Sequence, residues 1–159
     1  MEVGLILAIL GAAIAIIGGG IGSSIGVGIA GEIAAGIVAE DPEKFGKTLL
    51  LQAIPGTQGI YGFLAGFWVM LKVGMLGQVA QLSVANGVQI IMACIPVAVN
   101  CLISGIYQGR VSVAGIAMVG KKPDEAGKGL IFAAMVETYA VLGLLATILL
   151  VNGVPIAVK

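Results

Sequence analysis

The sequence predicts an all-α membrane protein with four transmembrane helices in two duplicated helical hairpins. Composition, the placement of charge and an internal repeat support this fold class. The 159 residues are 59% hydrophobic and 10% charged, with a mean hydropathy of +1.14, whereas soluble domains typically contain about 25% charged residues. Charge is absent from 3–31, 48–71 and 73–109, and 129–158 contains only Glu137. Each stretch supplies the roughly 20 apolar helical residues that cross a bilayer, without the alternating polarity of spanning strands.

The internal repeat has an offset of 81 residues. This offset aligns Pro42 with Pro123, each in a short charged loop. It also aligns seven further pairs of identical residues: Ser23 with Ser104, Gly28 with Gly109, Gly46 with Gly127, Lys47 with Lys128, Ala53 with Ala134, Thr57 with Thr138 and Gly62 with Gly143. We therefore predict one membrane domain, with a first hairpin over residues 1–80 and a second over residues 81–159.

The charged loops divide each hairpin into two helices, because proline after a helix end is a stop signal. We expect helices over 3–39, 45–72, 87–119 and 126–151, and the first and third exceed the bilayer thickness at 1.5 Å per residue. Six of the eight basic residues lie in or beside the charged loops: Lys44, Lys47, Arg110, Lys121, Lys122 and Lys128. The positive-inside rule then places both loops in the cytoplasm, and both termini and the turn around 74–86 outside.

Several other functions are disfavoured by the sequence. The chain has no histidine, which excludes histidine-based metal or acid–base chemistry, and no basic patch that would suggest nucleic acid. Met1 and Glu2 lack the basic start of a cleaved signal peptide. We interpret Cys94 and Cys101 as small apolar packing residues.

The glycines of the first helix predict close helix packing. Gly18, Gly22 and Gly26 have the small-xxx-small spacing that lets helix backbones approach in lipid. A closed ring lined by this helix would use them well, and a simple helix dimer is an alternative. Residues 26–31 also match GxGxxG, but no strand precedes them and no acidic residue lies about 20 positions on, so a dinucleotide site is not expected.

Polar side chains are expected to converge at mid-membrane depth. Glu137 lies about 16 Å from the start of its helix, and Gln58 and Gln108 lie about 20 Å from the charged-loop ends of theirs. Four further polar residues lie within a turn of this level: Thr57, Tyr61, Thr138 and Tyr139. Because an ionisable group inside a spanning helix is expensive, Glu137 is by default a functional residue.

One carboxylate with neutral oxygens is typical of a site for a monovalent cation. The carboxylate offsets the charge, and the oxygens of Gln and Thr replace the water shell of a hard ion. A proton alone needs only a carboxyl group in an apolar pocket, so the surplus oxygens favour Na⁺. Interhelical hydrogen bonding by the glutamines is the structural alternative. Glu32 and Arg110 lie nearer the charged loops, where their side chains are expected to reach water or each other.

The chain resembles the proteolipid K or c subunit of V-type rotary ATPases, in particular the sodium-pumping bacterial form. The resemblance covers nearly the whole sequence. It is carried by Gly22-Ser23 to Gly31-Glu32, Asp41-Pro42-Glu43-Lys44-Phe45-Gly46, Leu51-Gln52, Pro55-Gly56-Thr57-Gln58-Gly59, Tyr61-Gly62-Phe63, Ser104-Gly105-Ile106, Gln108-Gly109, Lys121-Lys122-Pro123 and Lys128 through Glu137-Thr138-Tyr139-Ala140.

The resemblance implies a closed ring of identical subunits that turns in the membrane of a bacterial cell. The implied ion site uses the side chains of Thr57, Gln58, Gln108 and Glu137 with the backbone carbonyl of Ile54, and Tyr61 donates a hydrogen bond to the carboxylate. The implied partners are identical subunits, lipid, a stator subunit with a basic residue, and central-stalk subunits at loops 40–47 and 120–128. The chain would carry the ion without catalysing hydrolysis itself.

The duplication adds an expectation about energetics. At the offset of 81, Gly56 stands in the place of Glu137, so the chain carries one carboxylate for four helices. Fewer ions per turn means more energy per ion, which favours a pump over a synthase. A proton-coupled ring is the nearest alternative. A channel is disfavoured by the apolar first helix, and a secondary transporter with paired sites by the single carboxylate.

Overall fold

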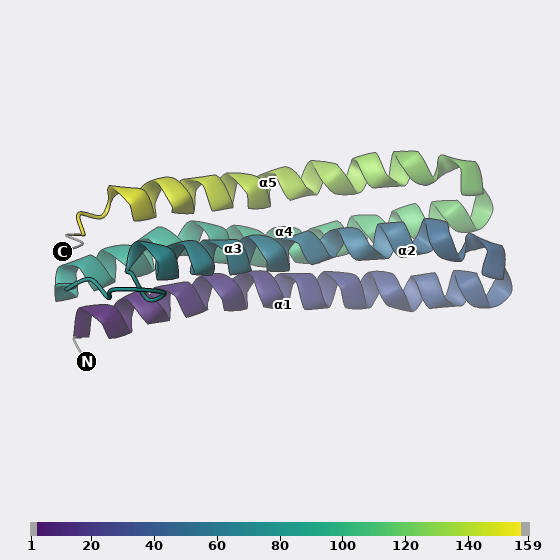
Figure 1. Cartoon of the computed structure of the whole chain (residues 1–159). Helices are drawn as coiled ribbons and strands as arrows, with labels where there is room; N and C mark the ends of the chain where they lie inside the picture. The colour runs from purple at the N-terminus through teal and green to yellow at the C-terminus, as the bar shows by residue number, and fades with distance from the viewer. Residues whose placement is uncertain (1–2, 157–159) are drawn as a thin grey trace.

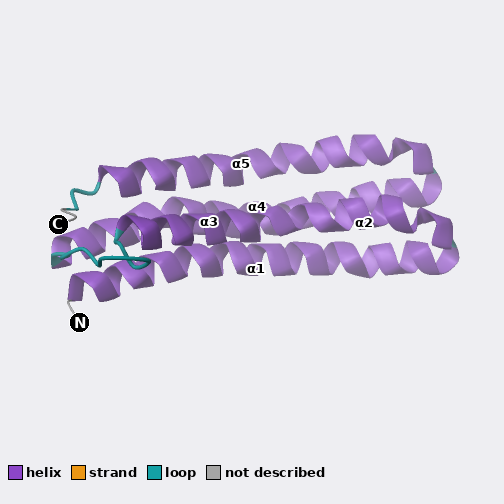
Figure 2. Ribbon diagram, viewed as in Figure 1, coloured by secondary structure: helices purple, strands orange, loops and turns teal. Residues whose placement is uncertain are grey.

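The computed structural model describes residues 3–156, which form two helical hairpins lying side by side (Figure 1). The first hairpin contains α1 (Val3–Glu40), η1 (Pro42–Lys44), α2 (Phe45–Ala53), η2 (Ile54–Gly56) and α3 (Thr57–Lys72). The second contains α4 (Val84–Lys121), η3 (Pro123–Glu125) and α5 (Ala126–Gly153). Figure 2 shows helices and loops alone over the described residues, with both tight loops at one end of the molecule. The all-α, four-helix prediction is confirmed.

Three of the four helical rods are long and apolar enough to cross a membrane by themselves: Val3–Glu40, Val84–Lys121 and Pro123–Gly153. The fourth rod is divided, and the prediction of one unbroken helix over 45–72 was wrong. A 3₁₀ turn over Ile54–Gly56 separates α2 from α3, although the rod keeps its direction (Figure 1). Pro55 explains the break, because its ring lacks an N–H and conflicts with the carbonyl four residues earlier.

The other helix boundaries follow from local capping. At the first charged loop, the Asp41 side chain accepts a hydrogen bond from the Glu43 amide at 3.1 Å, and Pro42 begins η1. Helix α4 starts three residues before the predicted residue 87, because Ser83 and Asn86 form a capping box. Such a box satisfies amide groups that the first helical turn leaves unpaired. The predicted boundary between residues 80 and 81 falls in the connection before this box, and it stays a prediction.

Helices α1 and α4 pack with their backbones in close contact. A Cβ at Gly18 would lie 2.5 Å from the Ala98 carbonyl oxygen, and one at Gly22 would collide with the Cys101 carbonyl. A Cβ at Gly26 would meet the Gly105 carbonyl in the same way. These glycines therefore serve close packing inside one chain.

The core has an apolar cluster on either side of a polar level. The cluster toward the chain ends includes Cys94 and Cys101, both free and buried, as their predicted packing role requires. The cluster toward the charged loops is built on Leu51 and Ile116. Between the two clusters lie five polar residues that we call the polar layer: Ser23, Gln58, Ser104, Gln108 and Glu137. The fold therefore gathers buried polar side chains at one depth.

Candidate functional site

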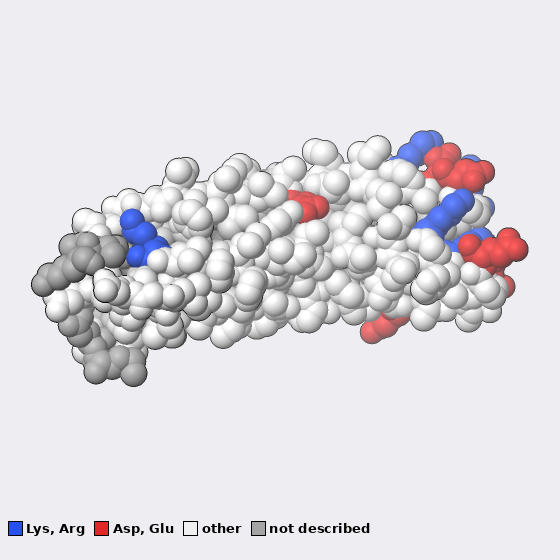
Figure 3. Space-filling model, viewed as in Figure 1, with Lys and Arg blue, Asp and Glu red and all other residues white. Residues whose placement is uncertain are grey.

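Glu137 lies midway along α5 and is held by side chains from two other helices. The Tyr61 hydroxyl on α3 donates a hydrogen bond to Glu137 Oε1 at 2.5 Å, and Gln108 Nε2 on α4 lies 3.4 Å from Oε2. The charged residues gather mainly at the loop end of the molecule, with a separate acidic patch about midway along it (Figure 3). Both carboxylate oxygens are therefore fixed in position, far from the charged loops.

The two glutamines join the hairpins to each other. Both are fully buried, at 0% exposure, and Gln58 Nε2 donates to Gln108 Oε1 at 2.6 Å. Gln108 Nε2 also donates to the Ala133 carbonyl on α5 at 3.0 Å. Buried amides are costly when unpaired, so these contacts hold α3, α4 and α5 in one arrangement around the carboxylate.

The helix break at Pro55 brings further oxygen atoms to the site. Thr57 Oγ1 donates to the Ile54 carbonyl at 3.0 Å and lies 3.5 Å from Gln58 Oε1. The Thr57 amide also bonds the Ile54 carbonyl, as the 3₁₀ turn requires. A main-chain carbonyl, a hydroxyl and an amide oxygen therefore lie together within one turn of the chain.

All six residues predicted for the site belong to one connected set. Ile54, Thr57, Gln58 and Tyr61 come from the first hairpin, and Gln108 and Glu137 come from the second. Their role as ligands stays a prediction.

The two other polar residues expected near this level face away from it. Thr138 donates to the Met135 carbonyl of its own helix at 2.8 Å, and Tyr139 is 65% exposed. Neither residue joins the set around Glu137, although both follow it directly in the sequence.

Sequence reasoning missed Ser23. Its hydroxyl contacts the main chain on both sides of the break, at Pro55 and Gly59. The one available signal was the identical Ser104 at the repeat offset, which by itself does not indicate a contact.

The set can offer hard oxygen ligands around a single negative charge. Among residues 3–156, no three His, Cys, Asp or Glu side chains gather into a possible metal site. The oxygens around Glu137 are instead a carbonyl, a hydroxyl and amide groups, which suit a hard cation of low charge.

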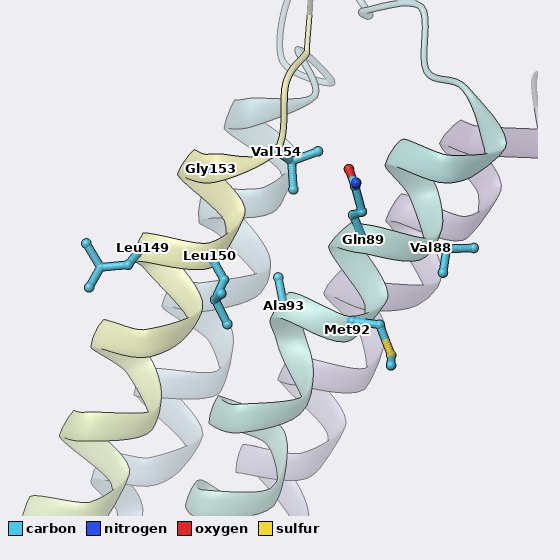
Figure 4. Close-up of a pocket in the computed structure, with 8 residues that line it drawn as sticks. All are labelled: Val88, Gln89, Met92, Ala93, Leu149, Leu150, Gly153 and Val154. Atoms are coloured by element: carbon cyan, nitrogen blue, oxygen red, sulfur yellow. The ribbon is translucent and has the colours of Figure 1, made fainter.

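Two cavities lie on the surface of α5. One of about 420 Å³ is lined by Ala134, Glu137, Thr138, Val141 and Leu142, so the carboxylate borders a mostly apolar outer face. Another, of about 440 Å³, lies between α4 and α5 at the end of the molecule away from the charged loops (Figure 4). Its lining includes Gln89, Leu150 and Val154, more than three helical turns from Glu137. The cavity in Figure 4 is therefore separate from the polar layer.

Glu32 and Arg110 do not form an ion pair in the described part of the chain. Both side chains are exposed, and the Arg110 guanidinium lies 5.2 Å from the centre of the Tyr107 ring. Of the two arrangements expected for them, the one that reaches water is therefore present. Neither residue contributes to the site around Glu137.

Comparison with known proteins identifies the family. The family model for the C subunit of ATP synthase matches the chain twice, over residues 10–69 and 91–150. The chain belongs to this ATP synthase family. The two matched segments begin at residues 10 and 91, which reproduces the repeat offset of 81 and confirms the duplication.

Two relatives within reach of this family resemble the chain over most of its length. It is 49% identical over 148 residues to the V-type sodium ATPase subunit K of Enterococcus hirae, covering 93% of this chain and 92% of that protein. It is 39% identical over 161 residues to the A-type ATP synthase subunit K of Methanocaldococcus jannaschii, covering 94% of this chain and 64% of that protein. The resemblance to the V-type proteolipid is confirmed, and with its apolar helices the chain is a multi-pass membrane protein.

Proposed function

We propose that this chain is the ion-carrying rotor subunit of a V-type rotary ATPase and binds Na⁺ at Glu137. The observation that carries the proposal is the connected set of side chains from α3, α4 and α5 around one carboxylate between two apolar clusters. The similarity to a subunit named for a sodium ATPase supports the choice of ion. The chain moves the ion and leaves ATP hydrolysis to other subunits.

The proposed ligands are the carboxylate of Glu137, the side-chain oxygens of Thr57, Gln58 and Gln108, and the carbonyl of Ile54. Oxygen ligands of this kind replace the hydration shell of a hard cation. Tyr61 completes the arrangement from the outer side by holding Glu137 Oε1. Because its hydroxyl binds the carboxylate, Tyr61 would keep the loaded site closed.

Electrostatics would couple ion binding to rotation. A site occupied by Na⁺ is nearly neutral, so it can face lipid while the ring turns. The empty carboxylate is an unpaired anion, and moving it into hydrocarbon is too costly. The ion is therefore exchanged only beside a stator subunit, which would offer a basic residue and two half-channels.

The assembly follows from the same requirement. Identical copies form a closed ring surrounded by lipid, with central-stalk subunits bound at loops 40–47 and 120–128. In a bacterial cell membrane these loops face the cytoplasm and both chain termini face outside. The terminal residues 1–2 and 157–159 lie outside the described residues. With Gly56 in the place of Glu137, each copy carries one ion, which favours pumping against a steep gradient.

Carbodiimide labelling of the intact ring tests the ion and the residue together. The reagent modifies a carboxyl group in an apolar site, so bound Na⁺ should protect Glu137. At constant pH, we expect labelling to fall saturably with Na⁺ and to be unchanged by the same concentration of K⁺. Glu137→Gln is the blank and should take up no label at this depth.

Two outcomes would contradict the proposal in different ways. Labelling that responds to pH and not to Na⁺ would assign the ring to protons, the alternative carried by the same fold. Na⁺-protected labelling that persists in Glu137→Gln would place the ion site elsewhere in the chain.

A further inference from the structure

The Ser23 hydroxyl of α1 bridges the two sides of the helix break in the neighbouring rod. Ser23 Oγ donates to the Pro55 carbonyl at 2.7 Å and accepts a hydrogen bond from the Gly59 amide, also at 2.7 Å. Pro55 and Gly59 are four residues apart, the spacing of acceptor and donor in an α-helical hydrogen bond. The Ser23 side chain is 8% exposed, so both contacts are shielded. One buried hydroxyl therefore serves main-chain groups before and after the break.

Ser23 acts as the cap that α3 lacks in its own sequence. The N-cap residue of α3 is Gly56, and no side chain of that residue can cap the helix. Gly59 is the third residue of α3, whose amide an N-cap serine ordinarily serves from the same segment. Here a serine from another helix accepts that hydrogen bond. The start of α3 is therefore fixed by α1.

The surface of α1 is shaped so that this hydroxyl reaches the main chain. A Cβ at Gly19 would collide with the Gln58 carbonyl oxygen, and a Cβ at Gly26 would lie 2.8 Å from Pro55 Cβ. Gly19, Ser23 and Gly26 share one helix face at spacings of four and three residues. Glycines on either side of Ser23 thus permit the close approach of α1 to the break.

The segment that Ser23 holds carries three of the proposed ion ligands. Ile54 directly precedes Pro55, and Thr57 and Gln58 directly precede Gly59. We infer that Ser23 is a positioning residue of the Na⁺ site, which sets the placement of these ligands without touching the ion. The inference rests on the proposed function, because it concerns the same site.

Ser104 provides a matched control within the same chain. It stands 81 residues after Ser23, is 4% exposed, and its Oγ has no hydrogen-bond partner. The residues of α5 equivalent to Pro55 and Gly59 are Val136 and Ala140, which lie in an uninterrupted helix. Removing the Ser104 hydroxyl therefore removes the same atom from an equally buried position, away from any helix break.

The test compares Ser23→Ala and Ser104→Ala in assembled rings. For each we would measure the Na⁺ and Li⁺ concentrations that halve carbodiimide labelling of Glu137, together with the melting temperature. We expect Ser23→Ala to require about threefold to tenfold more Na⁺, the loss typical of one or two hydrogen bonds. It should also change the ratio of Na⁺ to Li⁺ affinity, because misplaced ligands discriminate ion size differently. Ser104→Ala should match the wild type in both, and Ser23→Thr, which keeps the hydroxyl, should restore Na⁺ affinity toward the wild-type value.

Three results would overturn the inference. The first is a Na⁺ requirement in Ser23→Ala equal to that of the wild type, and the second is an equal weakening in Ser104→Ala. The third is failure of the ring to assemble in Ser23→Ala alone, which would assign Ser23 to folding. None of these affects the proposed function, which fails only if Na⁺ does not protect Glu137 in the wild type.

Discussion

The two hairpins follow one plan but supply different parts of the site. The first contributes the neutral oxygens of Ile54, Thr57 and Gln58, whereas the second contributes the carboxylate of Glu137. At the equivalent position the first hairpin has Gly56. Neither hairpin could assemble the set alone, because its contacts run between α3 of one hairpin and α4 and α5 of the other. Duplication therefore allowed the halves to become complementary.

The hairpins also differ in how closely their helices approach at this depth. Where α1 has Gly19 and Gly26, α4 has the larger Asn100 and Tyr107. These two residues line a cavity of about 270 Å³ between α4 and α5, together with Ile103, Ser104, Val136 and Tyr139. The serine found in both hairpins thus meets a helix break in the first and a cavity in the second. The same residue has different consequences because its neighbours differ.

The largest expected effect comes from giving the first hairpin a carboxylate. In Gly56→Glu the new Cβ has room, because its nearest neighbour is Val27 Cγ2 at 3.8 Å. Val27 stands where the second hairpin has Gln108, so the added group lacks an equivalent amide partner. A charged carboxylate without partners costs about 3 kcal/mol at the centre of a spanning helix, so we expect it to stay protonated.

Mass spectrometry of carbodiimide-treated rings checks this expectation. The variant should carry two reactive carboxyl groups per chain at this depth, and Na⁺ should protect one of them, Glu137. Protection of both groups by Na⁺ would show that the first hairpin retains a working site.

A smaller loss of Na⁺ binding is expected from exchanging the residues at the glutamine position. Gln108→Val gives the second hairpin the residue of the first and leaves the amide of Gln58 and the carbonyl of Ala133 without their partner. Each buried unpaired group costs about 1–3 kcal/mol, so we expect the Na⁺ affinity to fall by about 100-fold. The measurement is the Na⁺ concentration that halves Glu137 labelling. Val27→Gln is the matched control and should bind Na⁺ as the wild type does; similar affinities in both variants would contradict the proposed ligand set.

The smallest effect is expected at the tyrosine that holds the carboxylate. Tyr61→Phe removes only the hydroxyl that donates to Glu137 Oε1, a hydrogen bond that Leu142, the equivalent residue of the second hairpin, cannot make. We expect the Na⁺ affinity to fall by about tenfold, mainly through faster release, because a bond to a charged group is lost. Stopped-flow exchange of Na⁺ measures the release rate. Tyr139→Phe, at an exposed tyrosine, should leave that rate unchanged, and a Tyr61→Phe rate equal to it would remove Tyr61 from the site.

The sequence predicted the depth of the site better than the path of its backbone. Counting along each helix placed Gln58, Gln108 and Glu137 at one level, and their side chains do meet. The break at Pro55 was missed, although the proline was visible. Pro96 shows why, since it lies inside α4 and leaves that helix continuous. Whether a proline opens a spanning helix depends on partners from other helices.

The sequence by itself determined which segments span the membrane and how deep each polar side chain lies. Hydropathy and the rise per residue are local properties of a helix, so they can be read along the chain. Only the tertiary structure decided which side chains face each other, such as Tyr61 with Glu137, and that Ser23 reaches the break. Those contacts depend on how each helix is rotated and packed against the others, and glycines such as Gly19 set that packing only through the helices that they meet.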